Sequence, residues 1–188
     1  MFVGRVNADK APEIAVEVAR AAGLPLTMMV KRSEPTEWDY WNEVVVPLLH
    51  DGVEVIEQPP HAMKVELVGR ARATLCPINW PEPFGLVLAE SLACGTPVIT
   101  RPVGAAPEIV THGSTGFLCD TTEEMIEAVD GVASLSPQVC REHAAERFSA
   151  DAMVGSYEAV YRAVGWGQKS PGTAAAMTAA QELSSTSR

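Results

Sequence analysis

The chain has 188 residues, 47% of them apolar, and a formal net charge of −10. These values are typical of one globular domain and exclude a wholly disordered chain. The acidic balance disfavours general binding to nucleic acid or anionic lipid, because both require cationic side chains to neutralise phosphates. No apolar run approaches the ~20 residues of a membrane-spanning helix, and the start of the chain lacks a secretory signal. We therefore expect a cytoplasmic protein.

Strands alternate with helices along most of the chain. Short apolar runs predict strands at residues 2–3, 26–30, 52–57, 73–78, 97–100 and 116–119. Apolar residues at helical spacing predict helices at residues 12–22, 38–48 with a kink or end at Pro47, 62–71, 83–94, 121–132, 137–147 and 150–164. Such alternation predicts an α/β fold, a Rossmann-like doubly wound parallel sheet of about six strands with helices on both faces.

The composition changes near residue 166. Residues 1–166 hold all the expected elements and form one domain, whereas residues 167–188 are small and polar without a strong apolar face. Such a segment offers little apolar surface to offset the entropy of ordering, so we expect residues 167–188 to be a disordered tail.

Metal and disulfide chemistry are not expected. The four histidines are isolated and show no metal-ligand spacing. The four cysteines include no CxxC pair, and in a cytosolic protein they are expected to be buried free thiols: Cys76, Cys94, Cys119 and Cys140.

The segment EPFGLVLAESLACGTPV, residues 82–98, places two acids in an apolar surrounding. Apolar residues cover every direction around the helix expected after Pro83, and a helix apolar on all sides is a buried one. An ionised Glu90 in such a helix requires partners. Two neighbouring ribose hydroxyls can both donate to one carboxylate, which makes Glu90 a candidate ribose ligand. The alternative is that Glu90 pairs with a core arginine or extends to solvent.

Glu82 lies just before the same helix. Backbone N–H groups are free at a helix N-terminus and favour anions and polar oxygens. A sugar hydroxyl bound there would lie between Glu82 and the amides of Phe84 and Gly85. The alternative is an ordinary acidic residue near a helix N-terminus.

Two further loops join a strand to a helix and carry candidate phosphate contacts. Arg5 and Lys10 lie in GRVNADK, where two cations would neutralise a diphosphate and stabilise it as a leaving group. The alternative for these cations is a solvated loop with a surface ion pair to Asp9. Gly104 in GAAPE allows close approach of a phosphate to the backbone, although glycine after a strand is usually only a turn.

These stretches, in this order, resemble the carboxyl-terminal domain of glycosyltransferase family 4, which has the GT-B fold. The resemblance rests on GRVNADK, EPFGLVLAESLACGTPVIT, GAAPEIV, GSTGFLCD and RFSADAMVGSYEAVY, and it covers about residues 2 to 165. The most specific part is the pair of glutamates with seven residues between them, followed by Ala-Cys-Gly-Thr-Pro-Val.

The resemblance implies a domain that binds a nucleotide-diphosphate sugar. It implies that Arg5 and Lys10 hold the diphosphate, that Glu82 contacts the donor sugar and that Glu90 binds the ribose. It places further donor contacts at Phe84, Gly85, Leu86 and Gly104. It also implies transfer of a hexosyl group with retention of configuration, without a cofactor and usually without a metal.

The chain departs from this family's pattern. Ala11 replaces the glycine that usually follows the lysine, and MMVKRSEP replaces a glycine-containing turn. Met1 lies at the start of the domain's first strand, so the amino-terminal half that carries most of the acceptor site is expected to be missing. The chain is then a fragment or one part of a split enzyme, and we expect it to be inactive in transfer without that half. Two other functions stay open: a non-catalytic nucleotide-sugar-binding module, and another nucleotide-sugar enzyme of the same architecture, such as an epimerase.

Overall fold

The computed structural model describes residues 1–165 and divides the chain into two compact units, Met1–Phe148 and a second unit that begins at Ser149. The expected tail, residues 167–188, lies outside the described residues. Among the described residues, no helix combines the length and apolar character needed to cross a membrane.

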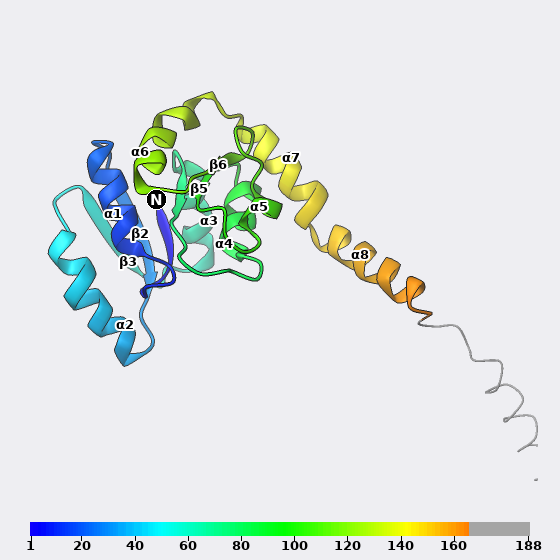
Figure 1. Ribbon diagram of the computed structural model, residues 1–188, viewed down its shortest axis with the longest axis horizontal. Coiled ribbons are helices and arrows are strands. Elements are labelled where there is room, and N and C mark those ends of the chain that lie inside the picture. Colours follow the sequence, from blue (N-terminus) through cyan, green and yellow to red (C-terminus); the bar gives the residue numbers. More distant parts are fainter. Residues whose placement is uncertain (166–188) are drawn as a thin grey trace, which may run out of the picture. The chain divides into compact units, whose positions relative to one another are not determined.

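The first unit is built on a six-stranded sheet in which every neighbouring pair of strands is parallel, in the order β3-β2-β1-β4-β5-β6 (Figure 1). Strand β1 lies between β2 and β4, with Phe2 opposite Met28 on one side and Leu75 on the other. The prediction of a doubly wound parallel sheet is therefore confirmed. The strands are β1 (Phe2–Arg5), β2 (Leu26–Lys31), β3 (Val53–Glu57), β4 (Thr74–Cys76), β5 (Val98–Thr100) and β6 (Gly116–Leu118).

Most of the helices lie close to their predicted positions. They are α1 (Pro12–Ala21), α2 (Pro35–Tyr40), α3 (His61–Arg70), α4 (Leu86–Ala93), α5 (Ala106–Ile109), α6 (Thr122–Gly131), α7 (Pro137–Phe148) and α8 (Ala150–Ala163).

Three local differences from the prediction have physical reasons. Helix α4 begins at Leu86 rather than Pro83, because its N-cap Gly85 has a left-handed backbone with φ of 84°. Helix α5 was not predicted, since four residues are too short to show a helical period. The expected kink near Pro47 occurs as a π-helical turn, Trp41–Val45, followed by a 3-10 turn, Val46–Leu48.

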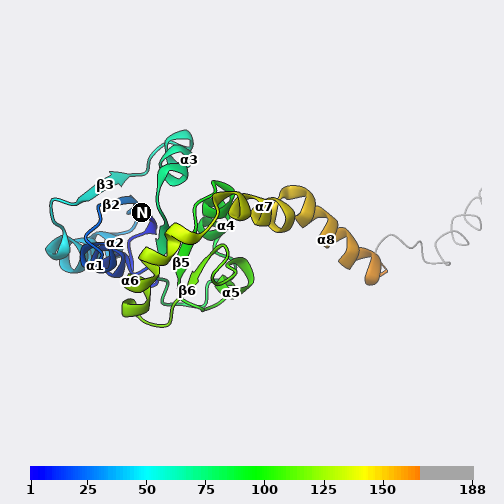
Figure 2. The same ribbon diagram turned by 90° about the horizontal axis from the view of Figure 1, so that it is seen from above.

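Helices cover both faces of the sheet. On one face, α1 and α6 pack over a continuous core that includes Met28, Val30 and Ile99. On the other face, α4, α5 and α7 enclose a second core that includes Leu92 and Cys140. Figure 2 shows α1 and α6 on the opposite side of the sheet from α3 and α4.

The cysteines behave largely as expected. All four are free, and Cys76, Cys119 and Cys140 are buried, whereas Cys94 is half-buried. Burial raises the pKa of each of these thiols, and that of Cys76 rises to about 12. The buried thiols therefore remain protonated at neutral pH and are poor nucleophiles.

The second unit is described up to residue 165 and contains α8. Ser149 caps this helix by accepting a hydrogen bond from the Ala152 amide. Its apolar side chains recur on one side, as the sequence predicts, and none of its residues is buried. The exposed apolar side chains are Met153, Val154, Tyr157, Val160, Tyr161 and Val164.

Candidate functional site

The loops that follow β1 and β4 meet at the carboxyl end of the sheet. The backbone N–H of Asn79 donates to the carbonyl of Asp9 at 2.8 Å, and its side-chain amide donates to the carbonyl of Ala8 at 3.3 Å. These bonds join residues about seventy positions apart in the chain and bring the end of one loop against the other. In open parallel sheets this edge is where ligands bind.

The β1–α1 loop has a fixed shape. The side chain of Asn7 accepts a hydrogen bond from the Lys10 amide at 3.1 Å, and its carbonyl accepts one from Ala11 at 3.0 Å. Ala11 is fully buried and has φ of 47°, a left-handed conformation that glycine adopts more easily. The glycine that the resemblance leads one to expect here would adopt this backbone without strain, whereas alanine at this position carries strain of about 1 kcal/mol.

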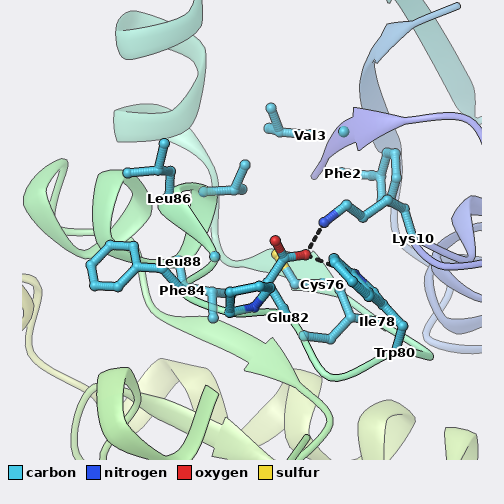
Figure 3. Close-up of a pocket in the computed structure, with 14 residues that line it drawn as sticks. Phe2, Val3, Lys10, Cys76, Ile78, Trp80, Glu82, Phe84, Leu86 and Leu88 are labelled. Carbon is cyan, nitrogen blue, oxygen red and sulfur yellow. Dashed lines mark hydrogen bonds and ion pairs between the residues drawn. The ribbon is translucent and has the colours of Figure 1, made fainter. Parts of the chain in front are cut away.

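Lys10, Trp80 and Glu82 form one cluster between these loops (Figure 3). The Lys10 ammonium makes an ion pair with Oε2 of Glu82, and the Trp80 indole N–H donates to the same oxygen at 2.9 Å. The ammonium also lies 5.8 Å from the centre of the Trp80 ring. Among the described residues, no donor binds Oε1 of Glu82, so this oxygen is available to a ligand.

This cluster lines a pocket with a volume of about 440 Å³. Most of its wall is apolar, and the lysine and glutamate supply the charged groups, an arrangement typical of small-molecule sites. The Cys76 thiol also forms part of the wall, but its raised pKa makes it a neutral surface. The lining residues are Phe2, Val3, Gly4, Lys10, Cys76, Ile78, Trp80, Glu82, Pro83, Phe84, Gly85, Leu86, Val87 and Leu88.

The start of α4 forms one side of this pocket. Within the described chain, the amides of Phe84 and Gly85 donate to no backbone or side-chain acceptor, as expected before a helix N-terminus. The expectation of a helix buried on all sides is wrong, because Leu86 is 69% exposed and Phe84 is 41% exposed. Only part of the apolar surface of α4 packs in the core, and the rest borders the pocket.

A second pocket of about 310 Å³ adjoins the first, since Val3 and Val87 line both. Glu90 from α4 and Lys64 from α3 meet here, with the ammonium 2.9 Å from both carboxylate oxygens. The Glu90 side chain is 44% exposed, so its expected burial is wrong, and its partner is a lysine rather than a core arginine. The pocket is lined by Val3, His61, Lys64, Val65, Val68, Thr74, Val87, Glu90, Ser91, Ala93 and Cys94.

Arg5 lies at the same end of β1 but does not line either pocket. Its Nε donates to Glu37 at 2.5 Å and one Nη donates to Glu34 at 2.8 Å. Glu37 is buried and also accepts from the Ser33 amide at 2.6 Å. Burial acts to raise the pKa of Glu37, but the hydrogen bonds from the Ser33 amide and Arg5 outweigh it, and its pKa falls below the ordinary value. The raised pKa of Arg5 has its largest cause in the hydrogen bond to Glu37.

Gly104 lies outside the pocket and packs against the backbone of Glu82. Its φ is 57°, and a Cβ at this position would lie 2.5 Å from the backbone nitrogen of Glu82. The next residue, Ala105, donates to the Glu82 carbonyl at 2.9 Å. In this structure, the glycine therefore allows close approach of the Glu82 backbone.

The structure thus brings together some of the predicted site residues and not others. Lys10, Glu82, Phe84, Gly85 and Leu86 share one pocket, and Glu90 lies in the adjoining one, whereas Arg5 and Gly104 lie outside both. Two polar residues were missed: Trp80 and Lys64. Trp80 had a signal, because it lies two positions before Glu82, but Lys64 reaches Glu90 only through the tertiary fold.

Comparison with known proteins identifies the family. Residues 1–147 match the family described as Glycosyl transferases group 1. The chain belongs to this family. Among its curated relatives, D-inositol 3-phosphate glycosyltransferase of Rhodococcus erythropolis is 33% identical to this chain over 178 residues. The alignment covers 83% of this chain and 40% of that protein. N-acetyl-alpha-D-glucosaminyl L-malate synthase of Bacillus anthracis is 36% identical over 88 residues, 43% of this chain and 23% of that protein. The chain therefore spans less than half the length of these relatives.

Solved structures show the same fold. Anabaena Alr3699/HepE in complex with UDP aligns with a TM-score of 0.69 and 22% identity, covering 86% of this chain and 48% of that one. A glycosyltransferase from Rickettsia africae aligns with a TM-score of 0.72 and 17% identity, covering 89% and 48%. The six-stranded parallel sheet with helices on both sides is thus that of GT-B glycosyltransferases. In residues 1–165, no group of three or more His, Cys, Asp or Glu side chains is arranged to hold a metal ion.

Proposed function

We propose that this chain is the donor-binding domain of a cytoplasmic, retaining hexosyltransferase of glycosyltransferase family 4. The enzyme transfers a hexosyl group from a nucleotide-diphosphate sugar to an acceptor. The observation that carries the proposal is the pair of adjoining pockets, one containing Lys10 and Glu82 and the other containing Glu90. A nucleotide sugar presents a ribose, a diphosphate and a hexose in sequence, which fits this order of polar groups.

The nucleoside occupies the second pocket in this proposal. Two ribose hydroxyls donate to Glu90, whose 44% exposure leaves it accessible to a ligand. The solved structures of Anabaena Alr3699/HepE contain UDP and UDP-glucose, which makes uridine nucleotides the first ligands to test.

The diphosphate lies where the two pockets join. Lys10 neutralises part of its charge, and the free amides of Phe84 and Gly85 and the nearby amide of Leu86 supply hydrogen bonds at the start of α4. Arg5 adds a second cation at the same end of β1, where it is 47% exposed and held by ion pairs with Glu34 and Glu37. In transfer, these groups stabilise the diphosphate as it leaves. Gly104 keeps the Glu82 segment close to this position.

The donor hexose lies against Glu82. Oε2 is bound by Lys10 and Trp80, and Oε1 accepts a hydroxyl of the sugar. No metal or other cofactor is needed in this scheme, because the phosphate charge is met by protein cations and amides.

Transfer also requires an acceptor held in near-attack geometry with water excluded. We propose that a further amino-terminal domain supplies this part, either in the same protein or as a separate chain. The lengths of the relatives support this, since the chain spans only 40% of the Rhodococcus enzyme. The alternative function is a non-catalytic nucleotide-sugar-binding module, or one subunit of a split enzyme.

Calorimetry with UDP, UDP-glucose and uridine tests the binding proposal. Lys10→Ala should weaken UDP binding at least about 10-fold, because it removes a hydrogen bond between charged groups, and should hardly affect uridine. Equal losses for both ligands would show damage to the loop instead of a lost phosphate contact. A transfer assay with a panel of nucleotide sugars, with and without an amino-terminal half, separates the enzyme from the binding module. Robust transfer by the 188-residue chain alone would contradict the need for a second domain.

A further inference from the structure

Lys64 lines the second pocket and has no role in the function proposed above. It projects from α3 to α4, and its ammonium lies 2.9 Å from both oxygens of Glu90. No other described residue donates a hydrogen bond to this carboxylate. Lys64 is only 25% exposed, so it is better shielded from solvent than the glutamate it binds. Its position therefore fixes the orientation of Glu90 in the pocket.

The geometry leaves Glu90 able to bind a ligand. A carboxylate has about four lone-pair sites, two on each oxygen. The ammonium uses one site on each oxygen, so one site on each oxygen remains for another donor. Two neighbouring hydroxyls, spaced like those of a ribose, match these remaining sites.

An unrestrained glutamate side chain would lose rotational freedom when it binds two hydroxyls. Lys64 removes much of this cost before the ligand arrives, because it holds the carboxylate by both oxygens. It also forms part of the pocket wall, on α3 between His61 and Val68 in the sequence.

We propose that Lys64 is a positioning residue that makes the pocket selective for ribonucleotides over 2′-deoxyribonucleotides. This inference rests on the proposed function, because it requires that Glu90 bind the ribose. If the pair were only a surface ion pair, its removal would affect stability slightly and would leave ligand discrimination unchanged.

The test compares the affinity of the chain for UDP with its affinity for 2′-deoxy-UDP. The same comparison is made between ADP and 2′-deoxy-ADP and between GDP and 2′-deoxy-GDP. The variants are Lys64→Met and Glu90→Gln, with Arg70→Met as the matched control. Arg70 lies on the same helix, carries the same charge and pairs with Glu66, but it lies outside the second pocket. Lys64→Arg keeps a cation beside Glu90 and tests for rescue.

We expect the unmodified chain to bind its preferred ribonucleotide about 10-fold or more tightly than the deoxy form. Lys64→Met should reduce this ratio several-fold by weakening ribonucleotide binding, with little change for the deoxy form. Glu90→Gln should nearly abolish the ratio, Arg70→Met should preserve it, and Lys64→Arg should restore part of it.

The outcomes separate the two proposals. If the unmodified chain binds no nucleotide, or binds ribonucleotides and 2′-deoxyribonucleotides equally tightly, the ribose contact of Glu90 is overturned, and the role of Lys64 with it. Discrimination that Glu90→Gln removes but Lys64→Met preserves would leave the ribose contact standing and overturn the role of Lys64.

Discussion

The two faces of the central sheet are built differently. Beneath α1 and α6, side chains such as Met28 and Ile99 are fully buried in a continuous core, and a pocket of about 450 Å³ borders this core at Ala19, Leu26 and Val129. On the opposite face, α3 and α4 leave two adjoining pockets that are lined in common by Val3 and Val87. The pockets beside α3 and α4 contain the Lys10–Glu82 and Lys64–Glu90 ion pairs, so we infer that this face supplies binding in addition to carrying its own buried core.

The largest expected effect tests this comparison by removing core volume. Ile99→Ala in the core beneath α1 and α6 should lower the free energy of unfolding by about 2–5 kcal/mol, because it leaves a cavity where a buried side chain was packed. Leu86→Ala beside the pocket should change it by only about 0.5 kcal/mol, since Leu86 is 69% exposed. Urea unfolding of both variants measures the difference. Similar losses would show that Leu86 contributes to packing as much as a buried core residue does.

Glu37→Gln sharpens the contrast between Arg5, held outside the pockets, and Lys10, which lines one. The substitution should lower the free energy of unfolding by about 1.5–3 kcal/mol at pH 7, because it weakens hydrogen bonds between Arg5 and a buried carboxylate. The lowered pKa of Glu37 means that its ionised form stabilises the folded chain above the ordinary value of 4.5 and that this contribution is lost as pH falls through the folded-state pKa. Urea unfolding of the unmodified chain and of Glu37→Gln should therefore give free energies of unfolding that differ less at acid pH than at pH 7. A difference independent of pH would rule out ionisation of Glu37 as its source.

A smaller effect is expected within the binding face. Trp80→Phe keeps an aromatic ring but removes the N–H that donates to Oε2 of Glu82. It should weaken binding of UDP-glucose about 3- to 5-fold and leave UDP binding nearly unchanged, because Trp80 orients Glu82 and only part of the roughly 1.5–3 kcal/mol of its bond to the carboxylate reaches the sugar contact. Calorimetry with both ligands measures this. An equal loss for UDP would place the role of Trp80 at the diphosphate rather than at the sugar.

Much of the fold could be predicted from the sequence because local patterns specify its elements. Alternating strands and helices gave the parallel sheet, and Pro12 and Gly23 marked the ends of α1. The start of α4 was misplaced because Pro83 is a good first helical residue, whereas the backbone of Gly85 delays the helix. Apolar periodicity also overstated the burial of α4, because it cannot distinguish a core contact from a pocket wall.

The candidate site was less predictable. Both Lys10 and Glu82 could be placed in loops at the ligand-binding edge of a parallel sheet, but their meeting follows from the pairing of β1 with β4, which was not predicted from the sequence. The engagement of Arg5 by Glu34 and Glu37 depends on how α2 returns to the loop, which no local pattern specifies. The pairing of Lys64 with Glu90 likewise depends on the packing of α3 beside α4.

Hydrogen exchange of backbone amides, with and without saturating UDP-glucose, tests most directly whether one face of the sheet is the binding face. We predict that the ligand slows exchange in the loop at residues 7–11, in the segment 79–90 and in α3. Exchange in α6 and in the carboxyl-terminal half of α1 should stay unchanged. Protection on α6 and α1, or protection nowhere in the chain, would contradict the assignment of nucleotide-sugar binding to the pockets beside α3 and α4.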